Sequence, residues 1–188
     1  MTKTKYSIQD SYRFISAVST GNMSFVLEVF ADNPDAWKWR EDRDDDRSVL
    51  HHAIAGRQPA MVDLLIRKGA KLELGARHEM RPLMLAAREG DAESVALLLE
   101  AGADAAAKDS DGRTALDYSQ LRKQGDSDTP RIQKWLVEAV ESPSQGRAIK
   151  SQTGRARVAQ TNEIFSNGAG KPMTASVARF RRKPDVKP

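Results

Sequence analysis

Apolar side chains recur at helical spacing in the middle of the chain. Val95, Leu98 and Leu99 stand at positions i, i+3 and i+4, which places them on one face of a helix. The preceding segment 83–87 repeats this spacing, and its alanines are small enough to let two helices approach closely. The pattern therefore predicts two short helices that pack against each other.

Turn and cap residues flank these two helices. Asp91 stands just before the second apolar pattern and is expected to cap the N-terminus of that helix, while Gly90 permits the turn before it. Gly102 follows the last apolar position, as is typical of a helix that ends in a left-handed residue. The predicted unit is helix, turn, helix and then a β-turn segment, here called the finger, that leads to the next unit.

The same pattern recurs along the chain at an offset of 33 residues. Leu50, Leu83 and Leu116 are separated by this interval, and so are Ala53 and Ala86. Two dipeptides recur at the same interval, Leu64-Leu65 with Leu97-Leu98 and Gly69-Ala70 with Gly102-Ala103. A period of this length is known from solenoid proteins, in which each unit buries its apolar face against the next.

The residues at this period resemble the ankyrin repeat. The segment 81–104 looks like the most regular unit of that family, Ser48-Val49-Leu50-His51 stands in place of its Thr-Pro-Leu-His tetrad, and Thr114-Ala115-Leu116-Asp117 is a weaker copy. The resemblance implies an all-α solenoid. It also implies that the imidazole of His51 hydrogen-bonds to backbone between fingers. Arg81 departs from the pattern, because it replaces the capping Thr.

We expect about four units in residues 1–141, with bounds near 10–43, 44–76, 77–109 and 110–141. The first is degenerate, as a capping unit with one solvated face should be, and joins its two helices at Gly21-Asn22. In the last, Thr129 is expected to be the N-cap of a final helix whose first turn holds Pro130.

Charge and composition both change near residue 142. Of 30 Lys and Arg residues and 26 Asp and Glu residues, ten and two respectively stand in 142–188, which gives this segment a net charge of +8 and the rest −4. Leu, Trp and Tyr are absent after residue 141. Such a segment buries too little apolar surface to offset its ordering entropy, so 142–188 is predicted to be a disordered basic tail.

Several function classes are disfavoured by the sequence. The chain has no cysteine, so it has no disulfide, thiolate nucleophile or Cys-ligated zinc. There is no run of about 18 apolar residues for a membrane span, and no secretory signal peptide is expected at the N-terminus. The three histidines show no metal-binding or catalytic spacing. The acidic run 41–47 lacks calcium-loop spacing. We expect neither catalysis nor a cofactor nor a metal.

The resemblance also implies where a partner would bind, namely the finger tips and the outward residues of the first helices. Carried over to this chain, these candidate partner-binding residues are Asp44, Asp45 and Arg47 in the second unit, Arg77, His78, Met80, Arg88 and Glu89 in the third, and Ser110, Asp111, Arg113, Leu121 and Arg122 in the fourth. Trp37 and Trp39 stand in a longer finger and are either binding anchors or buried against the first unit.

The tail holds one further pattern. Its apolar and basic residues would form a short amphipathic helix on a partner, an anionic surface or nucleic acid, and the alternative is an inert solubilising end. The residues are Met173, Val177, Arg179, Phe180, Arg181, Arg182 and Lys183. The basic cluster 179–183 resembles C-terminal signals of bacterial type IV secretion substrates, and also nuclear localisation signals.

Together these features predict a non-catalytic protein-interaction module, an adaptor or inhibitor, that is monomeric and cytoplasmic. Its partner would be another protein, bound by the repeats. The alternative is a protein tethered to nucleic acid or an anionic surface by its basic tail, or an effector exported through that tail.

Overall fold

The computed structural model describes residues 8–39, 46–121 and 128–141. The helices are α1 (Ile8–Thr20), α2 (Met23–Asp32), α3 (Val49–Ala55), α4 (Pro59–Arg67), α5 (Pro82–Glu89), α6 (Ala92–Glu100), α7 (Ala115–Gln120) and α8 (Thr129–Glu141). A short 3₁₀ turn, η1 (Ala36–Lys38), and a second short turn of non-helical geometry, η2 (Arg77–Glu79), lie in the fingers.

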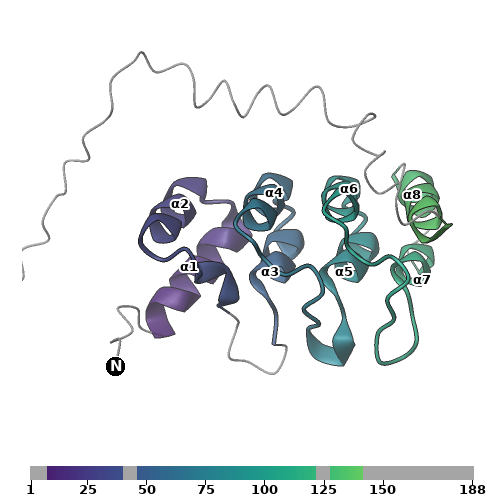
Figure 1. Ribbon diagram of the computed structural model, residues 1–188, viewed down its shortest axis with the longest axis horizontal. Helices are drawn as coiled ribbons and strands as arrows, with labels where there is room; N and C mark the ends of the chain where they lie inside the picture. Colours follow the sequence, from purple (N-terminus) through teal and green to yellow (C-terminus); the bar gives the residue numbers. More distant parts are fainter. Residues whose placement is uncertain (1–7, 40–45, 122–127, 142–188) are drawn as a thin grey trace, which may run out of the picture. The chain divides into compact units, whose positions relative to one another are not determined.

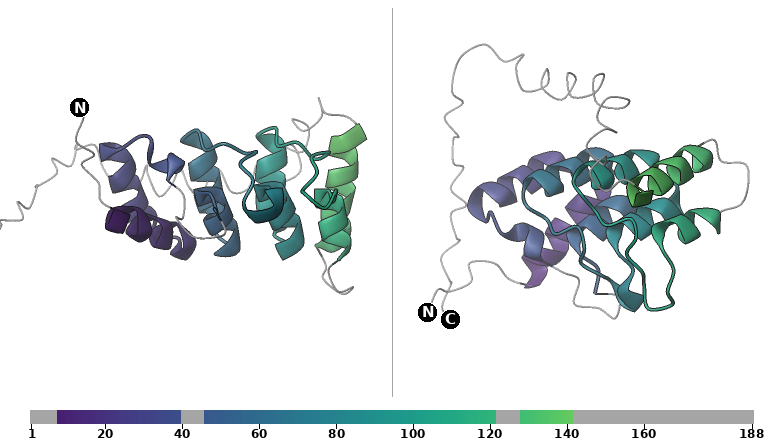
Figure 2. Two further views of the ribbon diagram at one scale, coloured as in Figure 1. Left: turned by 90° about the horizontal axis from the view of Figure 1, so that it is seen from below. Right: turned by 45° about the vertical axis from the view of Figure 1, so that its right-hand side comes forward.

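The helices form pairs that stack side by side in two rows (Figure 1). Helices α1, α3, α5 and α7 pack successively along one row, while α4, α6 and α8 pack along the other. The fingers that precede α5 and α7 extend beyond the first row, on the side away from α6 and α8 (Figures 1 and 2). The prediction of an all-α solenoid with four helix pairs is thereby confirmed.

The periodic apolar residues form the core between the rows. Val95 and Leu98 of α6 are fully buried, and Leu99 is 2% exposed. Ala86 and Ala87 of α5 are also fully buried, and their small side chains allow neighbouring helices to approach closely. Complete burial of a leucine or valine contributes about 1.5–3 kcal/mol relative to exposure, so this face accounts for much of the stability of the unit.

The predicted caps of the third unit are present. Asp91 Oδ1 accepts a hydrogen bond from the Ser94 backbone N–H at 3.1 Å, and its Oδ2 accepts one from the Ser94 hydroxyl at 2.6 Å. Gly90 and Gly102 have φ values of +67° and +92°, which side chains rarely adopt. These residues set the turn between α5 and α6 and the end of α6.

The first unit also follows the prediction. Gly21, with φ of +74°, joins α1 to α2, and the Asn22 side chain accepts a hydrogen bond from the Phe25 N–H at 3.2 Å. The buried ring of Phe14 lies edge-on to the ring of Phe30, with centroids 5.5 Å apart. This unit therefore has its own aromatic core.

The last helix begins one residue earlier than predicted. Because α8 starts at Thr129 and the Ile132 N–H bonds to the Asp128 carbonyl at 2.9 Å, Asp128 takes the N-cap position that the sequence analysis gave to Thr129. Pro130 still lies in the first turn, where it needs no partner for a backbone N–H. The predicted tail, 142–188, lies outside the described residues, and the unit bounds stay predictions. No helix in the described ranges is long and apolar enough to cross a membrane.

Candidate partner-binding face

The tip of the third-unit finger is a tight turn with unusual backbone angles. His78 has φ of +60° and ψ of +28°, and Glu79 has φ of +56°. The turn is closed by a hydrogen bond from the Met80 N–H to the Arg77 carbonyl at 3.4 Å. Two successive left-handed residues define a type I′ turn, which normally carries Asn and Gly rather than residues with long side chains.

We expect His78→Asn to stabilise the protein. Asn tolerates the left-handed region better than His, and relief of such strain contributes about 1 kcal/mol, or about 3 °C in Tm. Thermal unfolding followed by circular dichroism measures the shift. Ser110→Asn, in the next finger at an ordinary φ, should leave Tm unchanged. A lower Tm for His78→Asn would show that the turn is not strained.

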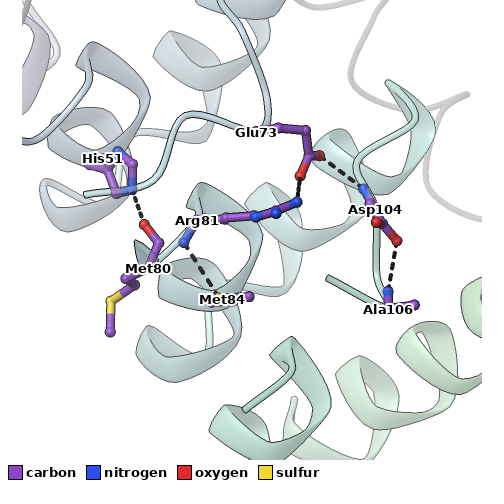
Figure 3. A network of polar contacts seen from close by, with 7 residues as sticks. All are labelled: His51, Glu73, Met80, Arg81, Met84, Asp104 and Ala106. Atoms are coloured by element: carbon purple, nitrogen blue, oxygen red, sulfur yellow. Dashed lines mark hydrogen bonds and ion pairs between the residues drawn. The ribbon is translucent and has the colours of Figure 1, made fainter. Parts of the chain in front are cut away.

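His51 connects this finger to α3. Its Nδ1 lies 3.2 Å from the Ser48 backbone nitrogen and 2.7 Å from Ser48 Oγ. Its Nε2 lies 2.8 Å from the Met80 carbonyl oxygen (Figure 3). Because the backbone N–H of Ser48 can only donate, Nδ1 accepts and Nε2 carries the proton that is donated to Met80. The role that the ankyrin resemblance implied for His51 is therefore present.

A hollow of about 170 Å³ opens between this finger and the first-row helices α3 and α5. The residues that line it are Arg47, His51, Ala76, Arg77, His78, Met80, Leu85 and Arg88. Five of them, Arg47, Arg77, His78, Met80 and Arg88, are candidate partner-binding residues from the sequence. The fold thus brings together residues from three separate segments that the sequence analysis had assigned to one face.

The rim of the hollow is basic. Arg88 forms an ion pair with Glu89, with Nη2 and Oε1 3.1 Å apart, and its Nη1 lies 3.5 Å from Met80 Sδ. Arg77 and His78 are exposed at the turn. Within the described part of the chain Arg77 makes no ion pair, and none of the residues lining the hollow is acidic.

The fourth-unit finger lies directly beside the third. The Ser110 backbone N–H donates to the His78 carbonyl at 3.0 Å, which joins the two finger tips. Asp111 and Arg113 are exposed and form an ion pair at 3.3 Å, so this part of the face has both charge signs. Leu121, at the end of α7, is 67% exposed.

Asp109 organises the fourth-unit finger. Burial acts to raise its pKa, but hydrogen bonds from the Tyr118 hydroxyl at 2.6 Å and from the backbone N–H groups of Arg113 and Asp111 outweigh burial and hold the pKa below its usual value. The backbone N–H of Thr114 and its hydroxyl lower the pKa of Asp117 in the same way.

These two carboxylates predict a loss of stability in acid. Because their pKa values are lower in the folded than in the unfolded chain, their stabilisation is complete above the usual carboxyl pKa and is lost as the pH falls through the folded values. The urea midpoint should fall between about pH 5 and about pH 3. The urea midpoint should fall by less over this pH range in the double variant Asp109→Asn, Asp117→Asn. An equal fall in the parent and the double variant would contradict the prediction.

A family model for ankyrin repeats in three copies matches residues 14–109. That segment is about half of the chain and runs from within α1 to the residues after α6. This chain belongs to the ankyrin repeat family.

Relatives from animals and plants share this similarity. The chain is 40% identical over 80 residues to the ankyrin repeat and SOCS box protein 6 of Mus musculus, covering 42% of this chain and 19% of that protein. It is 30% identical over 143 residues to the putative E3 ubiquitin-protein ligase XBAT31 of Arabidopsis thaliana, covering 76% and 29%. The protein LHCP TRANSLOCATION DEFECT of Arabidopsis thaliana is 63% identical over 35 residues, 19% of this chain and 20% of that protein. The chain thus spans under a third of these relatives.

The two finger tryptophans of this ankyrin repeat protein are half-buried, and Trp39 packs against the first unit. The rings of Trp39 and Phe14 meet edge-on with centroids 5.1 Å apart, and Trp37 packs against the core with Lys38 Nζ 5.5 Å from its ring centroid. Burial against the first unit, one of the two predicted alternatives, is therefore present for Trp39. A role of Trp37 or Trp39 in partner binding stays a prediction.

Some candidate residues cannot be placed on the ankyrin repeats. Asp44, Asp45 and Arg122 lie outside the described residues. So do the candidate contacts of the tail, namely Met173, Val177, Arg179, Phe180, Arg181, Arg182 and Lys183. Among the described residues, no group of three or more His, Asp or Glu side chains could hold a metal ion.

The structure accounts for Arg81, the residue that departs from the repeat pattern. Arg81 Nη1 lies 2.6 Å from Glu73 Oε2, and Glu73 Oε1 accepts a hydrogen bond from the Asp104 N–H at 3.0 Å (Figure 3). The backbone N–H of Arg81 donates to Met84 Sδ at 3.4 Å. The ion pair between Arg81 and Glu73 therefore joins successive units. The only feature of the sequence that could have predicted this pair is the opposite charge of the two residues.

Proposed function

We propose that this chain is a non-catalytic protein-interaction module, an adaptor or inhibitor, which binds a partner protein through its first-row helices and fingers. The observation that carries the proposal is the basic hollow beside η2. Candidate residues from the segment before α3, from η2 and from α5 converge there, although they are far apart in the sequence. Concave sites with a few convergent polar groups are the usual place for ligand binding.

Two further features support binding at this face. The finger tips are held in place by the Ser110–His78 hydrogen bond and by His51, so the surface is preorganised. The turn at His78 and Glu79 is strained, and strain of this kind is common at functional sites. The name of one relative, XBAT31, includes a ligase, but the alignment covers only 29% of that protein, so the proposal is limited to recognition of a partner.

Affinity capture with altered fingers tests the proposal. We expect the full chain to capture a defined protein from a lysate of its source cells after nuclease treatment. The double variant Arg77→Glu, Arg113→Glu should lose that protein, because both substitutions lie on finger tips. The control Arg67→Glu, Lys134→Glu makes the same charge change on α4 and α8 and should keep it. Retention by the finger variant would contradict binding at this face.

The charge of residues 142–188 favours one second candidate, a protein tethered to nucleic acid or to another anionic surface. Ten Lys and Arg residues against two acidic residues give that segment a net charge of +8. If this segment contacted 6–10 phosphates, raising the salt concentration from about 50 mM to about 200 mM would weaken binding about 10³- to 10⁵-fold. A partner retained by residues 1–141 alone, with a modest salt dependence, would favour the repeats instead.

A further inference from the structure

The hollow beside η2 combines guanidinium groups with an apolar floor. Arg47 comes from the segment before α3, Arg77 from η2 and Arg88 from α5, while Met80 and Leu85 supply apolar surface. Leu85 is 3% exposed and Met80 is half-buried, so the floor is formed by core residues and the rim by long charged side chains. Guanidinium groups bind carboxylates with two parallel hydrogen bonds, which a lysine cannot do.

The charges around the hollow favour an anionic ligand. Arg88 Nε and Nη2 lie 3.3 Å and 3.1 Å from Glu89 Oε1, and its Nη1 lies 3.5 Å from Met80 Sδ, so Arg88 contributes positive charge beside the hollow. Arg77 is exposed and forms no ion pair with any residue in the described ranges. Glu79 is also in the turn, but its Oε2 lies beside Gly75, 2.6 Å from the position a Cβ would take, and Glu79 does not line the hollow.

We propose that this hollow binds the carboxylate of an Asp or Glu side chain in a partner protein, with an apolar neighbour of that residue packed on Met80 and Leu85. The inference rests on the proposed function and names the chemistry of its partner. A hollow of about 170 Å³ is the size for one side chain, and its apolar floor does not suit a sugar-phosphate backbone. The carboxylate lies against Arg77, and Arg88 adds positive charge beside the hollow.

A peptide selection with the full chain tests this ligand. The probe is a random peptide library displayed on phage, and the selected peptides are synthesised and their Kd measured by fluorescence anisotropy. We expect the selected peptides to share an Asp or Glu next to an aliphatic or aromatic residue. Replacing that acid by its amide should weaken binding about 10- to 100-fold, the effect of losing charged hydrogen bonds.

Matched variants of the protein locate the site. Arg77→Gln should weaken binding of the same peptide about 10- to 100-fold. Arg67→Gln is the control, because Arg67 is exposed on α4 and paired with Asp63 at 2.6 Å, away from the fingers. Arg67→Gln should bind the peptide as the parent does. Circular dichroism of both variants tests whether they keep the fold.

The possible outcomes separate the two proposals. The carboxylate site would be overturned if the selected peptides bound equally well after their acid was replaced by its amide. It would also be overturned if they bound Arg77→Gln as well as the parent protein. If such peptides lost binding to a finger variant at Arg113, recognition by the repeats would still stand. Failure to enrich any peptide would contradict both the carboxylate site and the proposed function.

Discussion

Phe14→Ala should destabilise the protein by about 3–5 kcal/mol, one of the two largest effects that we expect of a single substitution. Phe14 is fully buried, and its ring meets Phe30 and Trp39 edge-on at centroid distances of 5.5 Å and 5.1 Å. The substitution removes both aromatic contacts and leaves a cavity. Urea denaturation followed by circular dichroism measures the loss in the free energy of unfolding.

Tyr12→Ala provides the control on the same helix. Tyr12 is 37% exposed, so its loss should cost less than about 1 kcal/mol. Equal effects of the two substitutions would show that the aromatic cluster does not stabilise the first unit. Trp39→Ala should fall between them, because Trp39 shares the contact with Phe14 but is half-buried.

His51→Ala should cost about 2–4 kcal/mol, because it removes the partner of three groups near the core. The backbone N–H and the hydroxyl of Ser48 lose their acceptor at Nδ1, and the Met80 carbonyl loses its donor at Nε2. The same substitution should weaken partner binding, since Met80 belongs to the hollow that His51 helps to form. Chemical denaturation and the peptide titration measure the two effects.

His51→Gln provides a partial rescue. Its side-chain amide has both an acceptor and a donor, so it should recover part of the stability lost in His51→Ala. If Ala and Gln were equally destabilising, burial of the imidazole rather than its hydrogen bonds would be the source of stability. If neither changed stability, the link between α3 and the third-unit finger would contribute nothing.

The sequence predicted features that depend on local spacing. Asp91 caps α6 and Gly102 follows its end. Both could be predicted because the residues that begin and end a helix act on neighbours only a few positions away. The apolar period identified the core of α5 and α6, and the repeat resemblance predicted the part played by His51. Even here a boundary moved by one residue, since Asp128 rather than Thr129 precedes α8.

Features that depend on distant or nonlocal contacts could not be predicted. Glu73 and Asp104 lie 31 residues apart, and nothing in the sequence pairs them. The left-handed turn at His78 and Glu79 carries neither of the residues that normally indicate it. The position of Trp39, which follows η1, depends on contact with the Phe14 ring in α1. In each case tertiary packing, rather than local propensity, decides the conformation.

The polar links between units have a consequence for how the protein comes apart. His51 bonds to Met80, Glu73 to Asp104 and Arg57 to the carbonyl of Glu89 across 29, 31 and 32 residues, so each link reaches only the adjacent unit. A terminal unit has a neighbour on one side, whereas an inner unit has two. We therefore expect unfolding to start at a terminal unit and to advance inward. A substitution that destabilises one terminal unit should leave the unit at the opposite end folded. The hollow beside η2, in the inner part of the array, is among the last features to be lost.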